Sequence, residues 1–387
     1  MGYNNSMSGV RLGLDARLSG VRHAGLGRYI KNLAARLPGA LPAGWQLSIV
    51  VADEKQWREI IDLSHEISQD VQNLSNVSVV VSPIPHYSLA EQVRLPALYR
   101  REKIDLLHVP HFNAPFFLGV AKLVVTIHDL LWHQSRGAGV TTLPAWQYGV
   151  KYAAYRALVD RVSARAAAIM VPSEQAGATV RQFYPGVAPK IQVIYNGSTD
   201  WSRFPAKAPN RPWPAKFLLY VGSLYPHKNV GLILEALGQR PDLQLVIVSA
   251  RDAFCQQMRE RVRARRLEKR VHFYHQLADS ELKDAYQRAL ALVQPSFSEG
   301  FGLTGIEALS LGTPVLASDI AIFREVYGAH FYAFDPRSVA SFIHELDQLT
   351  QENQGVRVAA YQAWAGRYDW DRTVDQTVAV YRKVIHE

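Results

Sequence analysis

The arrangement of short apolar runs constrains the fold of this chain more than any other feature. Runs rich in Val, Ile and Leu alternate with segments of helical periodicity, and the alternation occurs on both sides of a proline-rich stretch at 205–214. Continuous apolar runs are typical of strands buried on both faces, which helices must cover. The order strand, helix, strand therefore predicts an α/β chain with doubly wound parallel sheets.

The expected strands and helices indicate where a ligand site should lie. Open parallel sheets bind ligands outside the carboxyl ends of their strands, so two such sheets in tandem predict two Rossmann-like domains facing a cleft. We expect strands at 10–15, 46–52, 77–82, 106–109, 123–128, 168–172, 191–195, 217–222, 244–249, 271–274, 290–294 and 315–317. We expect the clearest helices at 27–37, 144–166, 173–183, 229–237, 253–266, 279–288, 304–311 and 371–386.

The proline-rich stretch suggests where one domain ends. Four prolines fall within residues 204–214, and this composition disfavours the interior of both helix and sheet. We interpret 205–214 as a linker between an N-terminal domain at 1–204 and a C-terminal domain at 215–369. Residues 371–386 carry apolar side chains at helical spacing, so 370–387 is predicted to be an amphipathic terminal helix.

Composition limits the compartment and the partners. The single cysteine, Cys255, excludes an intramolecular disulfide and a cysteine-based zinc site. No run of about 18 apolar residues occurs, and residues 1–6 lack the regions of a signal peptide. We therefore expect a cytoplasmic protein, soluble or peripheral on the inner face of the cell membrane. The formal net charge of +9 favours an anionic partner, either nucleic acid or an acidic membrane surface.

Much of the positive charge lies in one region. Residues 94–190 hold twelve Lys and Arg against five Asp and Glu. Aromatic residues are interleaved with them: Trp132, Trp146, Tyr148, Tyr152 and Tyr155. Basic and aromatic side chains together suit an anionic membrane interface. The alternative is a solvated helix face with the aromatic rings in the core.

The segment at 295–308 carries the clearest sign of chemistry. Gly300 and Gly302 lie between an expected strand and an expected helix, where they permit a ligand to approach the backbone. The free N–H groups that open the helix form an anion site without a metal. Glu299 and Glu307 can accept hydrogen bonds from hydroxyls in different parts of one long ligand. The alternative is a glycine-rich turn with a helix-start glutamate and a surface glutamate.

This segment resembles the signature of the retaining glycosyltransferases of family 4, which have the GT-B fold. The resemblance rests on Glu299 and Glu307 with seven residues between them, followed by Leu-Gly-Thr-Pro-Val at 311–315. It covers essentially the whole chain, since matching motifs also occur at 25–29, 126–129, 193–197 and 221–229. The resemblance implies that the N-terminal domain at 1–204 binds the acceptor, that the domain at 215–369 binds the nucleotide sugar, and that the terminal helix at 370–387 returns to the N-terminal domain.

The resemblance implies roles for the residues of the second half. Glu307 would hold the ribose hydroxyls of a nucleotide, and Glu299 would contact hydroxyls of the transferred sugar. Lys228 would neutralise the diphosphate. Many family members place an arginine where this chain has Ser223 or His227, so the cationic partner is weaker, although His227 retains a hydrogen-bond donor. Backbone N–H groups for the donor would come from Phe301, Gly302 and Leu303.

In the first half, the resemblance implies that Gly27 touches the donor diphosphate from a loop and that His128 bonds the donor sugar. His128 follows an apolar run, so it is expected at the carboxyl edge of a sheet; the alternative is a strand-end histidine capped by Asp129. The stretch Gly25-Leu-Gly27 could suggest a dinucleotide fingerprint. However, Ile30 stands where the third glycine is needed, which argues against a nicotinamide enzyme.

We expect no essential metal and no cofactor beyond the nucleotide-sugar donor. His108 and His111 flank a proline and no carboxylate cluster accompanies them, so they do not form a metal site. Asp369 and Asp371 resemble a metal-binding pair, but they open the predicted terminal helix, where an aspartate cap is the better explanation.

The expected function is a retaining hexosyltransferase, with GDP-mannose favoured as donor and a lipid-linked saccharide as acceptor in cell-surface polysaccharide assembly. GDP-rhamnose, UDP-glucose and UDP-N-acetylglucosamine remain alternative donors. Because no carboxylate nucleophile is assignable, the resemblance implies a front-face substitution. Two other classes remain open: a non-catalytic sugar-nucleotide or nucleic-acid binder, and an isomerase with the same fold. Nucleic acid is not the expected partner.

Overall fold

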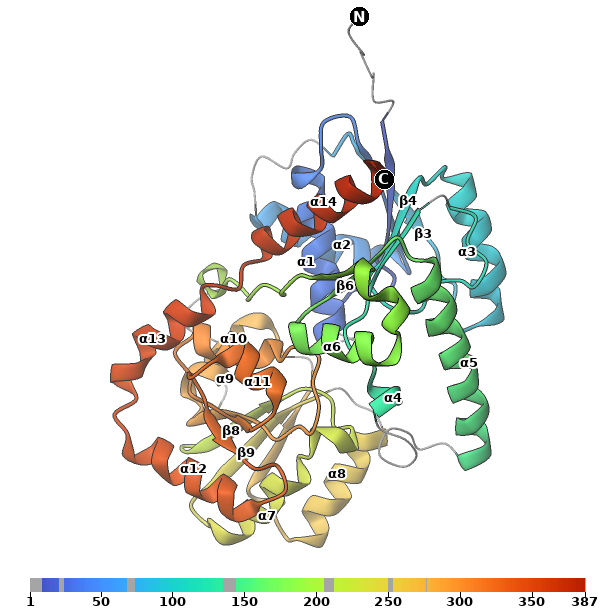
Figure 1. Ribbon diagram of the computed structural model, residues 1–387. Helices are drawn as coiled ribbons and strands as arrows, with labels where there is room; N and C mark the ends of the chain where they lie inside the picture. The colour runs from blue at the N-terminus through green and yellow to red at the C-terminus, as the bar shows by residue number, and fades with distance from the viewer. Residues whose placement is uncertain are drawn as a thin grey trace, which may run out of the picture. The chain divides into compact units, whose positions relative to one another are not determined.

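The computed structural model describes residues 9–20, 24–67, 74–120, 122–134, 144–204, 212–249, 253–275 and 277–386. The chain divides into two compact units. The first consists of Met1–Leu130, Leu143–Asn196 and Trp370–Glu387, and the second consists of Leu131–Thr142 and Gly197–Asp369. Each unit is built around one parallel sheet flanked by helices (Figure 1). The predicted class, two doubly wound Rossmann-like sheets, is confirmed.

The first sheet has seven strands in the order β3-β2-β1-β4-β5-β6-β7, all parallel. The strands are β1 Arg11–Asp15, β2 Gln46–Val51, β3 Val77–Val81, β4 Leu106–Val109, β5 Lys122–Thr126, β6 Ala168–Val171 and β7 Ile191–Val193. The helices are α1 Ala24–Ala40, α2 Glu54–Ile67, α3 Leu89–Arg101, α5 Ala145–Arg165, α6 Glu174–Phe183 and α14 Trp370–His386. All residues of β4 and β6 are buried, as expected for the inner strands of a sheet covered on both faces. The edge strand β7 is half-buried, and the edge strand β3 includes two exposed residues.

The second sheet has six parallel strands in the order β10-β9-β8-β11-β12-β13. The strands are β8 Phe217–Val221, β9 Gln244–Val248, β10 Val271–Tyr274, β11 Ala291–Gln294, β12 Val315–Ser318 and β13 Tyr332–Phe334. The helices are α7 Gly231–Gln239, α8 Ala253–Ala264, α9 Asp279–Arg288, α10 Leu303–Ser310, α11 Ala321–Tyr327, α12 Val339–Gln351 and α13 Gly355–Ala365. Short helices also occur: α4 Leu131–Gln134, η3 Pro185–Lys190, η4 Trp201–Arg203 and η5 Pro226–Lys228.

Sequence patterns located most strands to within two residues but missed several elements. The helices α2, α3, α11, α12 and α13 and the strand β13 were not predicted. β13 has only three residues, and the short apolar run at 331–334 that contains it has no Val, Ile or Leu. β5 ends at Thr126, so His128 follows the strand rather than ending it.

The terminal helix α14 packs on the first unit. It lies against α1, and Figure 1 shows the red helix beside the blue one. Its buried face includes Val374, Val378 and Tyr381. The Lys122 ammonium donates hydrogen bonds to the carbonyls of Val384 and Ile385, the last turn of the helix, where a cation is favoured by the helix dipole.

The division between the units differs from the predicted boundary at residue 204. Residues 197–204 pack in the second unit because Trp201 is buried against Tyr286 and because Lys283 donates to the carbonyls of Trp201 and Phe204. Residues 205–211 of the predicted linker lie outside the described residues.

Candidate active site

A lysine–glutamate pair forms the centre of the site in the second unit. Lys228 ends the turn η5, which follows β8, and Glu299 lies in the loop after β11. The Lys228 Nζ lies 2.6 Å from Glu299 Oε2, and the two side chains are 19% and 15% exposed. The Phe297 amide donates to the carbonyl of His227 at 2.8 Å, which ties the two loops together. The pair is therefore partly buried and still reachable from solvent.

The environment of Glu299 keeps its carboxylate ionised. Burial by itself would raise the pKa of Glu299, but the charge and hydrogen bond of Lys228 and the hydrogen bond from Ser296 lower it overall. Ser296 Oγ donates to Oε1 at 2.7 Å, so each carboxylate oxygen accepts one bond. Since each oxygen can accept a second, Glu299 retains capacity for ligand hydroxyls.

The start of helix α10 forms a second part of the site. Gly302, its N-cap, has φ of +92° and no side-chain cap hydrogen bond. A Cβ at Gly302 would lie 2.3 Å from the Tyr327 hydroxyl, so only glycine fits. The Phe301 ring is buried and packs edge-on against Tyr368, which anchors the preceding backbone. The amides of Leu303 and its neighbours are thus held at a helix N-terminus that favours an anion.

Glu307 lies inside α10 and is only 2% exposed. Thr199 Oγ1 donates to its Oε1 at 2.8 Å, and the Tyr286 hydroxyl donates to its Oε2 at 3.1 Å. The alternative of a surface glutamate is therefore wrong for this position. The assignment of ribose hydroxyls to Glu307 stays a prediction.

The two weaker candidates have structural partners. The His227 ring stacks on Tyr225, with ring centroids 5.9 Å apart and an interplanar angle of 15°. The carbonyl of Ser223 accepts the hydroxyl hydrogen bond of Tyr220.

In the first unit, Gly27 lies in a helix, as the predicted helix at 27–37 had it, rather than in the loop that the resemblance implies. It belongs to the first turn of α1, and a Cβ there would lie 2.0 Å from the carbonyl oxygen of Gly20. A Cβ at Gly25 would meet nothing within 4 Å. The requirement for glycine at position 27 therefore comes from close contact between two backbone segments.

His128 is held by its neighbours in one tautomer. Its Nε2 lies 3.2 Å from the carbonyl oxygen of Pro110, so Nε2 donates and Nδ1 is left as an acceptor. Burial lowers the pKa of His128 to about 4, so the ring is neutral at pH 7. The Tyr29 ring packs edge-on against His128 at 4.8 Å and, through its hydroxyl, contacts Thr126 Oγ1. His128 can accept a hydrogen bond from a ligand hydroxyl.

Sequence reasoning missed a buried charge cluster in the first unit. Arg17 donates to both oxygens of Asp15 and to Glu91 Oε1 at 2.8 Å, and its side chain is completely buried. Asn113 donates to Glu91 Oε2 at 2.9 Å, and Tyr99 donates to Asp15. The position of Asp15 at the end of an apolar run was a weak indication that its side chain lies at the edge of a sheet. Nothing in the sequence indicated that Glu91, which is 74 positions from Arg17, would contact it.

The histidines weighed as metal ligands have other partners. His108 is fully buried; its Nδ1 lies 2.6 Å from the Tyr381 hydroxyl and its Nε2 lies 2.9 Å from Thr126 Oγ1. Across the described residues, no group of three or more His, Cys, Asp or Glu could hold a metal ion. Asp371 lies in the first turn of α14 and pairs with Arg36 at 2.8 Å.

The structure thus brings together some predicted site residues in each unit. In the second unit, Lys228 contacts Glu299, and their loops adjoin His227. In the first unit, Tyr29 links the helix that contains Gly27 to His128.

Comparison with known proteins defines the class of this fold and site. Residues 23–199 match the family described as Glycosyltransferase Family 4, and residues 205–364 match Glycosyl transferases group 1. The fold is similar to that of sucrose-phosphate synthase from Thermosynechococcus elongatus, with a TM-score of 0.75 and 19% identity over 97% of this chain and 99% of that one. The fold is also similar to that of WaaG, a glycosyltransferase involved in lipopolysaccharide biosynthesis. The TM-score is 0.67 and the sequence identity is 16%, over 96% of this chain and 99% of that one. The protein is a glycosyltransferase with the GT-B fold.

Relatives with a named activity narrow the class. The O-antigen chain mannosyltransferase RfbU of Salmonella typhimurium is 35% identical over 186 residues, which are 47% of this chain and half of that protein's length. The phosphatidyl-myo-inositol mannosyltransferase of Mycobacterium tuberculosis is 29% identical over 328 residues, 78% of this chain and 82% of that protein. The chain belongs to glycosyltransferase family 4 and is mannosyltransferase-like.

Proposed function

We propose that this glycosyltransferase moves mannose from GDP-mannose, with retention, onto a lipid-linked saccharide during assembly of a cell-surface polysaccharide. The observation that carries the proposal is the Lys228–Glu299 pair beside the uncapped start of α10. This arrangement offers a cation and helix amides to a diphosphate and a carboxylate to sugar hydroxyls. Mannosyltransferases among the relatives support the choice of sugar.

Lys228 has the capacity to serve both the diphosphate and Glu299. Its ammonium has three donors, and one of them is engaged by Glu299. The remaining donors and the amides at Leu303 would stabilise the negative charge that develops on the phosphate as the bond to the anomeric carbon breaks. The departing phosphate oxygen would take the proton of the acceptor hydroxyl, whose oxygen bonds the anomeric carbon on the same face.

The proposal assigns a role to each of the other predicted contacts, considered within its own unit. Glu299 would accept hydrogen bonds from hydroxyls of the transferred sugar, and Glu307 from those of the ribose. His128 Nδ1 would accept from a sugar hydroxyl, and Gly27 would lie near the diphosphate. Charge neutralisation by Lys228 and a helix N-terminus requires no metal, so the proposal predicts activity in the presence of EDTA.

Thermal unfolding in EDTA with GDP-mannose, GDP, UDP-glucose or UDP tests the donor. A ligand at 100 times its dissociation constant adds about 2.7 kcal/mol of stability, so we expect a shift with the guanine nucleotides that disappears in Glu307→Ala. Glu268→Ala, which alters an exposed glutamate, is the matched control. A shift with the uridine nucleotides alone would indicate that the donor is UDP-glucose or UDP-N-acetylglucosamine instead of GDP-mannose. The absence of a shift with every nucleotide would contradict the proposed donor site.

Product analysis separates the transferase from the other classes. With membrane lipid extract as acceptor, we expect GDP release and a glycolipid product of retained anomeric configuration. Conversion of the sugar nucleotide without an acceptor would indicate an isomerase. Binding to nucleic acid with a steep salt dependence, and none to sugar nucleotides, would indicate a nucleic-acid binder instead.

We also propose that the first unit docks on an anionic membrane. Leu89, Val93 and Phe117 are 87%, 72% and 72% exposed. The exposed Arg94 lies on α3 with Leu89 and Val93, whereas the exposed Arg161 lies on α5 and Phe117 lies in a loop. Arg161 Nε donates to the carbonyl of Phe116, so this apolar loop adjoins α5. Among the described residues, no helix is long and apolar enough to cross a membrane.

The aromatic residues predicted to form this surface contribute less than expected. Tyr148 is buried, and Tyr155 packs against the core while its ring lies near that of Tyr152. Trp146 is 71% exposed. Flotation with phosphatidylglycerol-containing vesicles should recover the protein, phosphatidylcholine vesicles should recover less, and Phe117→Ser should reduce recovery. Equal recovery of Phe117→Ser and the unmodified protein would contradict this surface.

A further inference from the structure

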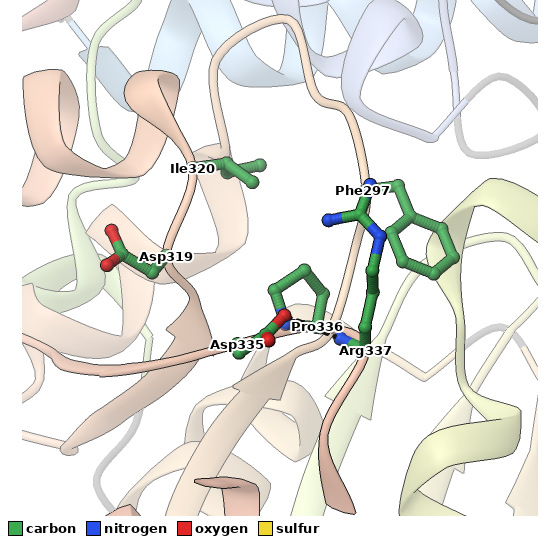
Figure 2. A pocket seen from close by; sticks show the side chains of 6 residues that line it. All are labelled: Phe297, Asp319, Ile320, Asp335, Pro336 and Arg337. Atoms are coloured by element: carbon green, nitrogen blue, oxygen red, sulfur yellow. Dashed lines mark hydrogen bonds between the residues drawn. The ribbon is translucent and has the colours of Figure 1, made fainter.

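A pocket of about 280 Å³ opens in the second unit beside the Lys228–Glu299 loops and has no role in the proposed donor contacts (Figure 2). Its walls come from the loops after three neighbouring strands, β11, β12 and β13. They consist of Phe297, Asp319, Ile320, Asp335, Pro336 and Arg337. Pockets for drug-sized ligands begin at about 300 Å³, so this one suits a single ring better than a whole nucleotide sugar.

The walls combine polar groups at the sides with apolar surfaces between them. In Figure 2 the Asp319 carboxylate and the Arg337 guanidinium stand on opposite sides of the pocket, with Ile320 and Pro336 between them. The Arg337 guanidinium lies 5.8 Å from the centre of the Phe297 ring, which is 44% exposed. Among the described residues, no carboxylate lies within ion-pair distance of Arg337, so its donors are available to a ligand.

The charges in and around the pocket are balanced, which favours a neutral ligand. Arg324 donates to both oxygens of Asp319, at 2.6 and 2.8 Å. The Oδ1 atom of Asp335 accepts the amide hydrogen bond of Arg337 at 2.9 Å. Two carboxylates are therefore matched by two guanidinium groups. A phosphate or an acidic sugar would gain little here.

The occupied carboxylate oxygens also argue against a nucleobase. Guanine recognition by an aspartate uses both oxygens at once, in the plane of the base, but Asp319 already receives two bonds from Arg324 and Asp335 has one oxygen engaged. Sugar hydroxyls require only single, separately placed acceptors and donors. A pyranose ring also has apolar faces that can lie against Ile320 and Pro336.

The pocket is joined to the Lys228 turn by two hydrogen bonds. The Phe297 amide donates to the carbonyl of His227 at 2.8 Å, and Asn229 Nδ2 donates to the carbonyl of Pro336 at 2.8 Å. Phe297 is also two residues from Glu299 in the same loop. A sugar ring in the pocket would therefore lie next to the group that is proposed to hold the transferred sugar.

We propose that this pocket is a saccharide subsite that binds a neutral pyranose unit of the acceptor. Arg337 would donate to its hydroxyl oxygens, and Asp319 and Asp335 would accept from its hydroxyls. The choice of the acceptor as the source of the sugar rests on the proposed transferase function; the binding of a pyranose rests on the pocket alone.

Saturation-transfer NMR with methyl α-mannopyranoside and methyl α-glucopyranoside tests the subsite on the full chain. We expect binding that weakens about tenfold in Arg337→Ala and in Asp335→Asn, as for the loss of a hydrogen bond to a charged group. Arg265→Ala, which removes a surface arginine 40% exposed in its side chain, is the matched control. No binding, or binding that neither pocket variant weakens, overturns the proposal.

Competition distinguishes the acceptor from the donor as the source of the sugar. Binding of the glycosides should persist when GDP-mannose is saturating. Displacement by GDP-mannose but not by GDP would show that the donor's own mannose fills the pocket and would overturn an acceptor subsite. Thermal shifts with the nucleotides, measured on the same samples, report the donor site separately, so a failed donor site and a failed saccharide subsite give different results.

Discussion

Two cation–carboxylate clusters lie at the carboxyl ends of strands, one in each unit, and they differ in how fully their polar atoms are used. In the first unit, the side chains of Arg17, Asp15 and Glu91 are 0%, 4% and 0% exposed. In the second unit, Lys228 and Glu299 are 19% and 15% exposed. Both clusters contain unlike charges in contact, so contact alone does not distinguish a binding site from a structural one.

The difference lies in the capacity that remains for a ligand. Both oxygens of Glu91 already accept bonds, including those from Arg17, Asn113 and the Tyr87 amide. Lys228 uses one of its three donors within the protein. A buried cluster whose hydrogen-bonding groups are all engaged within the protein holds together the loops that it joins. A partly exposed cluster with unused hydrogen-bonding groups can bind a ligand. We therefore expect changes in the first cluster to alter stability and changes in the second to alter activity.

The largest effect should come from breaking the buried cluster. Arg17→Met leaves two buried carboxylates without their cation, and removing one partner of a buried ion pair costs about 3–5 kcal/mol of unfolding free energy. Urea unfolding measures this loss. The matched control is Arg58→Met, since Arg58 is 74% exposed and 3.6 Å from an exposed Glu54; it should change stability by less than about 0.5 kcal/mol. Equal effects for the two arginines would remove the distinction between the clusters.

The opposite behaviour is expected for Lys228. Lys228→Ala should lower turnover by about 10²–10³-fold, as for the loss of one group that stabilises developing charge, while the urea midpoint changes little. Donor turnover and unfolding should be measured on the same preparation. Lys216→Ala serves as control because Lys216 is 47% exposed and pairs with Asp242 on the surface. A variant that unfolds but keeps full turnover when folded would assign Lys228 a structural role.

Acid should act on the buried cluster. Burial would raise the pKa of Glu91, but hydrogen bonds from His86, Arg17 and Asn113 lower it from 4.5 to about 2. A carboxyl with a lowered folded pKa stabilises the protein above its unfolded pKa, and this contribution is lost as pH falls from about 4.5 to about 2. We expect about 3 kcal/mol of unfolding free energy to be lost over this range.

The pH dependence can be tested with two glutamate variants. In Glu91→Gln this acid-dependent loss should be absent, whereas Glu54→Gln, which alters an exposed glutamate, should retain it. Identical pH profiles for Glu91→Gln and the unmodified protein would show that Glu91 does not carry the effect.

The smallest change in stability is expected at the start of α1, where two glycine variants test whether Gly27 is required for packing or for ligand contact. Gly27→Ala places a Cβ 2.0 Å from the Gly20 carbonyl oxygen and should cost about 1–3 kcal/mol of stability. Gly25→Ala meets nothing within 4 Å and should be neutral or slightly stabilising in a helical turn. Thermal unfolding compares the two. If Gly27→Ala lowers donor affinity without lowering stability, Gly27 acts at the ligand rather than through packing.

Local patterns predicted those parts of the fold and site that depend on neighbours in the sequence. Runs rich in apolar side chains located β4 and β10 at their observed bounds, although each strand contains a histidine and β10 is mostly half-buried. The loop after β11 was recognised because Gly300, Gly302 and Glu299 are adjacent. The family resemblance implied a loop at Gly27, whereas the predicted helix at 27–37 began there. The helix α1 begins earlier, at Ala24, and the close approach of the Gly20 backbone to Gly27 could not be read from the spacing of the glycines.

The sequence by itself determined the alternation of strands and helices, the two-sheet class and the identity of the glycine-rich loop, because these follow from side chains close together in the chain. Only the tertiary structure decided that Arg17 meets Glu91, that Lys228 meets Glu299 from 71 positions away, and that Phe297 and Arg337 share a pocket. The physical reason is that strand order in a parallel sheet sets which loops lie side by side, and this order is not written in the spacing of any one motif.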